Sequence, residues 1–123
     1  MACKITEFVL DCRDAERLAA FWCDILGWSV LGREESDGSI EIGPPGGDPF
    51  TIVLSPAPEP KTSKLRLHLD VSPTDRDQPA ELERLLAAGA RPADVGQTGE
   101  ESWHVLQDPE GNEFCLLRTR VPS

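Results

Sequence analysis

The pattern of strands and helices expected from this sequence occurs twice along the chain. The first copy begins with alternating apolar and polar residues over 4–12, which predict a strand, and continues with a helix whose apolar residues recur at helical spacing. Asp14 is the expected N-cap of this helix, and Gly27 lies at its C-terminal stop. Three further strands are expected over Trp28–Glu35, Ile40–Gly43 and Phe50–Ser55. The predicted order of elements is therefore β-α-β-β-β.

The same order begins again after the proline-rich stretch Pro56–Ser63. A strand over Leu65–Ser72 precedes a helix that has Pro79 in its first turn and ends at Gly89. The remaining strands are expected near residues 91–97, 102–107 and 113–120. The second half of the chain therefore predicts another β-α-β-β-β module.

Corresponding stretches of the two copies also match in sequence. Val9-Leu10-Asp11-Cys12 corresponds to His68-Leu69-Asp70-Val71, and Phe50-Thr51-Ile52 corresponds to Phe114-Cys115-Leu116. Such an internal repeat indicates a duplicated architecture. We predict one α+β domain over residues 1–123, with module one at 1–56, a linker at 57–63 and module two at 64–123.

The charge of the chain restricts its partners. Its 12 basic and 22 acidic residues give a net charge of −10, which argues against binding to nucleic acid or to an anionic membrane. No apolar run approaches a membrane span and no signal peptide is recognisable, so we expect a soluble, cytoplasmic protein. The four cysteines lack Cys-x-x-Cys spacing and are expected to be reduced thiols.

Three motifs carry a resemblance to a known superfamily. They are the helix stretch Ala20–Trp28, the strand Leu67-His68-Leu69-Asp70, and a final hairpin built on the turn Asp108-Pro109-Glu110-Gly111-Asn112. Together they resemble the vicinal oxygen chelate superfamily, which includes glyoxalases, bleomycin-resistance proteins and extradiol dioxygenases, and most closely its small glyoxalase-like branch. The resemblance implies two tandem βαβββ modules that form curved mixed sheets around a cup, and it implies a homodimer.

Alternation along the first strand of each module predicts which side chains line that cup. Residues expected to pack under the helices are Phe8, Leu10 and Cys12 in module one and Leu67, Leu69 and Val71 in module two. Residues expected on the opposite face are Glu7, Val9 and Asp11 in module one and Arg66, His68 and Asp70 in module two. Asp11 and Asp70 precede the helices, so we expect them in capping or turn contacts.

Metal-dependent members of the superfamily carry ligands on the first and last strand of each module. The resemblance places those positions on Glu7, Thr51, Arg66 and Cys115. Arg66 stays protonated and repels a cation, Thr51 is a poor ligand, and Cys115 is soft, so we expect neither a metal nor another cofactor. Including His68 instead of Arg66 gives Glu7, His68 and Cys115, which still falls short of a two-histidine, one-carboxylate site.

The tryptophans provide candidate aromatic walls. Trp22 lies on the apolar stripe of the first helix and is expected in the core, whereas Trp28 and Trp103 are candidates for the cup or its rim.

We therefore predict a metal-free cup that binds a small organic molecule. Arg66 is expected to contact an anionic or carbonyl group, and His68 and Glu7 to donate and accept hydrogen bonds. Thr51, Cys115, Trp103 and Trp28 complete the predicted binding residues. The alternative is a lyase or isomerase in which His68 and Glu7 exchange protons, and a divalent-metal-dependent lyase or dioxygenase is the third possibility.

Overall fold

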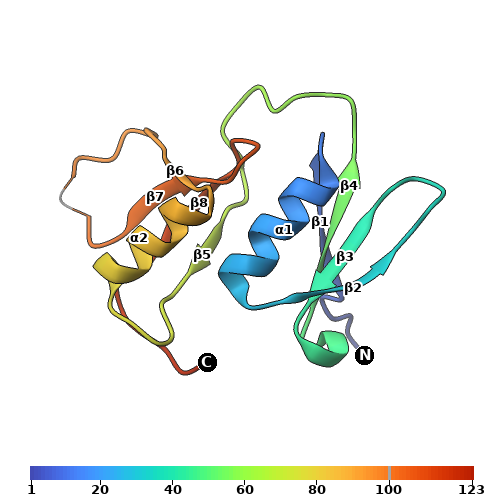
Figure 1. Cartoon of the computed structure of the whole chain (residues 1–123), viewed down its shortest axis with the longest axis horizontal. Helices are drawn as coiled ribbons and strands as arrows, with labels where there is room; N and C mark the ends of the chain where they lie inside the picture. The colour runs from blue at the N-terminus through green and yellow to red at the C-terminus, as the bar shows by residue number, and fades with distance from the viewer. Residues whose placement is uncertain (100) are drawn as a thin grey trace. The chain divides into compact units, whose positions relative to one another are not determined.

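A computed structural model describes residues 1–99 and 101–123 of the chain, in two compact units, Met1–Pro60 and Lys61–Ser123 (Figure 1). Each unit contains one helix and a four-stranded mixed sheet, with the elements in the order β-α-β-β-β. The prediction of an α+β fold made of two tandem βαβββ modules is confirmed.

The sheet of the first unit has the strand order β1-β4-β3-β2. Strand β1 pairs in parallel with β4, and the other neighbours are antiparallel. The elements are β1 Glu7–Cys12, α1 Ala15–Leu26, β2 Ser29–Arg33, β3 Ile40–Gly43, the short 3-10 helix η1 Pro45–Gly47, and β4 Thr51–Pro56.

Helix α1 begins and ends at the residues that the sequence indicates. The Asp14 carboxylate accepts a hydrogen bond from the Arg17 backbone N–H at 3.1 Å, and Gly27 closes the helix with φ of 68°. The buried stripe of α1 includes Leu18 and Trp22, which are 0% and 2% exposed. This stripe covers the face of the sheet that carries Ile42 and Leu54, and together they form the core of the first unit.

The predicted faces of β1 are correct. Phe8 and Leu10 are half-buried and Cys12 is buried, whereas Glu7, Val9 and Asp11 are exposed.

The second unit repeats this arrangement, with the strand order β5-β8-β7-β6. Strands β5 and β8 are parallel, and the remaining pairs are antiparallel. The elements are β5 Leu69–Val71, α2 Gln78–Ala88, β6 Arg91–Pro92, β7 His104–Gln107 and β8 Glu113–Leu116. Leu85 of α2, Leu106, Phe114 and Leu116 are almost completely buried and form its core.

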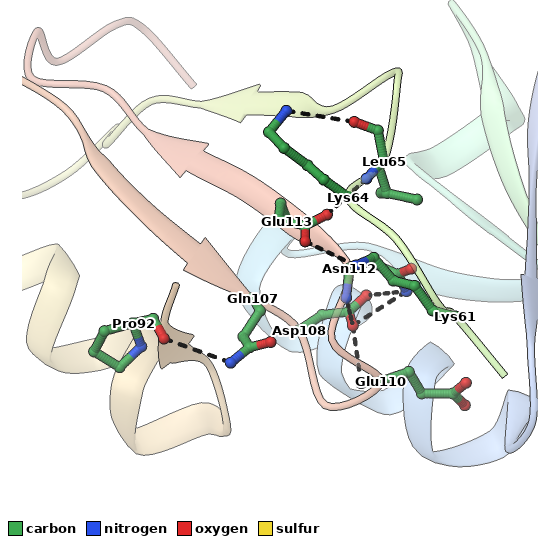
Figure 2. Close-up of polar contacts among 9 residues, drawn as sticks. All are labelled: Lys61, Lys64, Leu65, Pro92, Gln107, Asp108, Glu110, Asn112 and Glu113. Carbon is green, nitrogen blue, oxygen red and sulfur yellow. Dashed lines mark hydrogen bonds and ion pairs between the residues drawn. The ribbon is translucent and has the colours of Figure 1, made fainter. Parts of the chain in front are cut away.

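Strand β5 is shorter than predicted. On its N-terminal side, the Glu113 side chain takes the place of backbone hydrogen bonds between the strands. The Leu65 N–H donates to the Glu113 carboxylate at 2.9 Å, and the same carboxylate binds Lys61 Nζ at 2.7 Å (Figure 2). The chain then bends at residues 66 and 67 before it enters β5. The prediction that Leu67 packs under the helix is therefore wrong, and its side chain is 66% exposed.

The turn between β7 and β8 is organised by one buried carboxylate. Asp108 is 0% exposed, and its Oδ1 accepts from the backbone N–H groups of Glu110 at 2.9 Å and Asn112 at 3.0 Å. The Asn112 side-chain amide donates to Asp108 Oδ2 at 2.9 Å (Figure 2). These contacts hold the turn closed and set the register of β7 against β8.

Neither helix in the described part of the chain is long and apolar enough to span a membrane.

Candidate functional site

A cavity of about 350 Å³ lies in the second unit. Its walls come from strands β5, β7 and β8, from the segments that precede β5 and β7, and from the residue that follows β8. The lining residues are Lys64, His68, Asp70, Val95, Trp103, Val105, Glu113, Cys115 and Leu117. Most of this surface is apolar, and the polar groups are concentrated where β5 lies beside β8.

Three chemically versatile side chains meet in this cavity because of the parallel pairing of β5 with β8. Asp70 is the ladder partner of Cys115, so both side chains lie on the same face of neighbouring strands. His68 precedes Asp70 by two residues, and its Nε2 lies 3.2 Å from Asp70 Oδ1. The imidazole, the carboxylate and the thiol offer ligand atoms that all lie within 4.8 Å of one another. We call these residues the His68–Asp70–Cys115 cluster.

The surroundings of Cys115 favour its protonated form. Burial raises the pKa of the Cys115 thiol, and the negative charge of Asp70 and the hydrogen bond to its carboxylate raise it further, against a smaller opposing effect of Lys64. In the protein as described, Cys115 is therefore a thiol that donates to Asp70.

Glu113, at the edge of the same cavity, is occupied by structural contacts. Desolvation acts to raise the pKa of its carboxyl group, but the hydrogen bonds from Leu65 and Lys61 outweigh desolvation and hold the pKa below its usual value. Glu113 therefore stays ionised and joins the start of this unit to β8.

Three of the residues predicted for the site line this cavity, namely His68, Trp103 and Cys115. Trp103 is 43% exposed and forms its largest aromatic surface. The other histidine, His104, is the ladder partner of Leu116 and lies on the opposite face of the sheet from Cys115.

Arg66 is exposed and lies outside the described lining of the cavity. The first-strand match of the repeat equates Arg66 with Glu7, and the last-strand match equates Cys115 with Thr51. In the structure Glu7 is the ladder partner of Thr51, whereas the ladder partner of Cys115 is Asp70. Asp70 therefore takes the place beside Cys115 that the sequence alignment gave to Arg66.

The other predicted residues, Glu7, Thr51 and Trp28, belong to the first unit. Glu7 and Thr51 are neighbours on β1 and β4, and the Thr51 hydroxyl donates to a carboxylate oxygen of Glu41 on β3 at 2.8 Å. Trp28 is half-buried and meets the ring of Phe50 edge-on, with 6.2 Å between the ring centroids.

Sequence reasoning missed the position of Asp70. It was expected to cap or to stabilise a turn, but the N-caps of the two helices are Asp14 and Asp77. The alternation along Leu67–Asp70 did place Asp70 on the same face as His68. The pairing of Asp70 with Cys115 depends on the register of β5 against β8, and no local pattern in the sequence specifies that register.

Comparison with known proteins agrees with this architecture. Residues 7–117 match the model of the glyoxalase-like domain, so the chain belongs to that family, within the vicinal oxygen chelate superfamily. No curated protein matched the sequence.

Solved structures with the same fold include fosfomycin resistance proteins. FosX from Mesorhizobium loti is 12% identical with a TM-score of 0.74, over 98% of this chain and 95% of that one. The E126Q mutant of FosX from Listeria monocytogenes, complexed with Mn(II) and 1S,2S-dihydroxypropylphosphonic acid, is 15% identical with a TM-score of 0.72, over 95% and 90%. A glyoxalase/bleomycin resistance protein/dioxygenase family enzyme from Burkholderia phytofirmans PsJN is 19% identical with a TM-score of 0.65, over 93% and 97%. At these identities the likeness establishes the fold.

Proposed function

We propose that this protein binds a small organic molecule in the cavity of its second unit. The observation that supports this function is the composition of the cavity wall. Val95, Trp103 and Leu117 offer apolar surface, while His68 and Asp70 offer polar groups at one end. Small-molecule sites typically combine an apolar wall with a few convergent polar groups.

The volume of the cavity limits the size of the ligand. At about 350 Å³ it lies at the lower end of the range of roughly 300–1,000 Å³ that is usual for small-molecule sites. A single ring or a short carbon chain with one or two polar substituents is of suitable size. Trp103 would pack against the apolar part, and Lys64 at the rim would attract an anionic substituent.

The listerial FosX complex contains Mn(II), but we do not propose that this chain binds manganese. Manganese prefers oxygen ligands, whereas the donors gathered here are an imidazole, a thiol and a single carboxylate. The proposed ligand is held by the residues of the cavity wall.

Thermal-shift and ligand-observed NMR screening with a library of small carboxylic acids, phosphonates and aromatic alcohols tests this function. A compound present at ten times its Kd should stabilise the protein by about 1.4 kcal/mol. Trp103→Ala and His68→Gln should lose this stabilisation. His104→Gln and Arg66→Ala should keep it, because these two residues lie outside the described lining.

The opposite pattern contradicts the proposal. If hits stabilise Trp103→Ala and His68→Gln as much as the unmodified protein, they bind elsewhere. If Arg66→Ala alone abolishes the effect without unfolding the protein, the ligand binds at Arg66 and not in this cavity.

A further inference from the structure

We propose that a second cavity of this unit binds a small zwitterion, with a free α-amino acid as the class of ligand that fits it. The cavity has a volume of about 420 Å³, and Arg118, His104, Ser102 and Asp77 are among the residues that line it. We call it the Arg118 cavity. None of these four residues lines the cavity of the His68–Asp70–Cys115 cluster, so this inference concerns a different site from the proposed function.

The Arg118 cavity lies on the opposite side of the sheet from Cys115. His104 is the ladder partner of Leu116, and the neighbouring Cys115 points to the other face. Ser102 precedes His104 by two residues, and Arg118 follows Leu116 by two, so both continue along the same side as His104. The antiparallel register of β7 and β8 therefore gathers the hydroxyl, the imidazole and the guanidinium at one end of the hairpin.

The first turn of α2 is fastened to this end of the hairpin by one side chain. The Gln78 Nε2 group donates to the backbone oxygen of Ser102 at 2.8 Å and to that of Leu116 at 3.2 Å. Because Leu116 is completely buried, this bridge fixes α2 to a rigid part of β8. The wall that α2 contributes to the cavity is thus held in place before any ligand binds.

Charged groups of both signs line the Arg118 cavity without pairing with one another. Within the described part of the chain, Arg118 forms no ion pair with either of the two lining carboxylates, Asp77 and Glu101. The Glu101 carboxylate is engaged by its own loop, since it accepts from the backbone N–H groups of Thr98 at 2.7 Å and Gly99 at 3.0 Å. Arg118 and Asp77 are therefore the charged groups that remain available to a ligand.

A zwitterion complements this arrangement. The Arg118 guanidinium can bind a carboxylate through two parallel hydrogen bonds, and the Ser102 hydroxyl can donate a further one. Asp77 Oδ1 accepts from the Ala80 N–H at 3.0 Å, which leaves Oδ2 for an ammonium group. A simple anion would meet the negative charge of Asp77, and a simple amine would meet the positive charge of Arg118. A molecule with both charges a few bonds apart satisfies the two groups together, and His104 can donate to it or accept from it.

Binding measurements with the full chain test this site. The proteinogenic α-amino acids are screened by ligand-observed NMR, and each hit is titrated by isothermal calorimetry. We expect at least one amino acid to bind with a Kd of about 1 mM or below. The N-acetyl derivative and the carboxamide of that amino acid each lack one of its two charges. Each should bind about tenfold more weakly or worse, because a hydrogen bond to a charged group is lost.

Variants on the two charged groups make the test specific. Arg118→Ala and Asp77→Asn should each weaken binding of the amino acid by about tenfold or more. Asparagine is also a good N-cap, so Asp77→Asn removes the charge and keeps the start of α2. Arg120→Ala removes an exposed arginine outside the described lining, and Trp103→Ala alters the other cavity. Both of these controls should bind the amino acid like the unmodified protein.

The proposal is overturned if no amino acid binds with a Kd below about 10 mM. It is equally overturned if the N-acetyl derivative or the carboxamide binds as tightly as the free amino acid, since the site would then recognise a single charge. A hit that is lost in Trp103→Ala and kept in Arg118→Ala and Asp77→Asn binds in the other cavity, and that result also rejects the proposal. Circular dichroism establishes that each variant is folded, as expected for replacements of the exposed side chains Arg118 and Asp77.

Discussion

Asp108 provides a sharp test of how the final hairpin is stabilised. Its buried carboxylate accepts from the backbone N–H groups of Glu110 and Asn112 and from the Asn112 side-chain amide. Asp108→Ala leaves these three donors without this acceptor. A buried donor that loses its hydrogen-bond partner costs about 1–3 kcal/mol of stability. Water can reach part of this turn, so the lower end of that range applies to each of the three donors. The expected loss is about 3 kcal/mol in the free energy of unfolding.

Urea unfolding followed by circular dichroism measures this loss, and thermal unfolding should show a decrease in Tm of roughly 10–20 °C. Asp108→Asn keeps one carboxamide oxygen in the position of Oδ1, which receives both backbone donors, so its loss should be only about 1 kcal/mol. Glu83→Ala removes an exposed carboxylate on α2 and serves as the charge control, with an expected change within about 0.5 kcal/mol. If Asp108→Ala stays within that same margin, or if Asp108→Asn loses as much as Asp108→Ala, the turn does not depend on these hydrogen bonds.

Two further predictions concern the acid stability of the chain and the end of α1. The pKa of Glu113 is lowered in the folded protein, so its contribution is present above the unfolded pKa of about 4.3 and is lost as the pH falls through the lower folded value. Glu113→Gln should therefore be less stable than the unmodified protein at pH 7 and should approach it in stability below about pH 4. Urea titrations at pH 7 and pH 3 measure the difference between the two proteins, and an equal difference at both pH values would refute this prediction. Gly27→Ala should lower the free energy of unfolding by about 1 kcal/mol, because Gly27 has φ of 68°. Gly32→Ala should be close to neutral, because Gly32 has free space around it and no positive φ. Equal losses of stability in thermal unfolding would contradict this reasoning.

Much of the fold could be predicted because it depends on local signals. Asp14 and Gly27 define the ends of α1 through their own backbone preferences, and alternation along β1 separates Glu7 from Phe8 without knowledge of any partner strand. The repeat of these signals then indicates a duplicated module. None of these inferences requires a long-range contact.

The site was harder to predict because its key pairing joins distant parts of the chain. Which residue faces Cys115 depends on the register of two parallel strands that are far apart in sequence, and no local pattern specifies this register. The contacts of Glu113 with Lys61 and Leu65 also replace the start of the ladder with a side chain. Alternation alone could not show that Arg66 lies outside the strand while Asp70 meets the thiol.

The distribution of the tryptophans has a practical consequence for the study of the two modules. The chain contains no tyrosine, and two of its three tryptophans, the buried Trp22 and the half-buried Trp28, belong to the first unit. Unfolding moves the Trp22 ring from the core into water and shifts its emission to longer wavelength, while Trp103 is already 43% exposed and changes less. Intrinsic fluorescence therefore follows mainly the first module, and circular dichroism follows both. Coincident transitions by the two methods would mean that the duplicated halves unfold as one cooperative unit, and separate transitions would mean that each half retains a stability of its own.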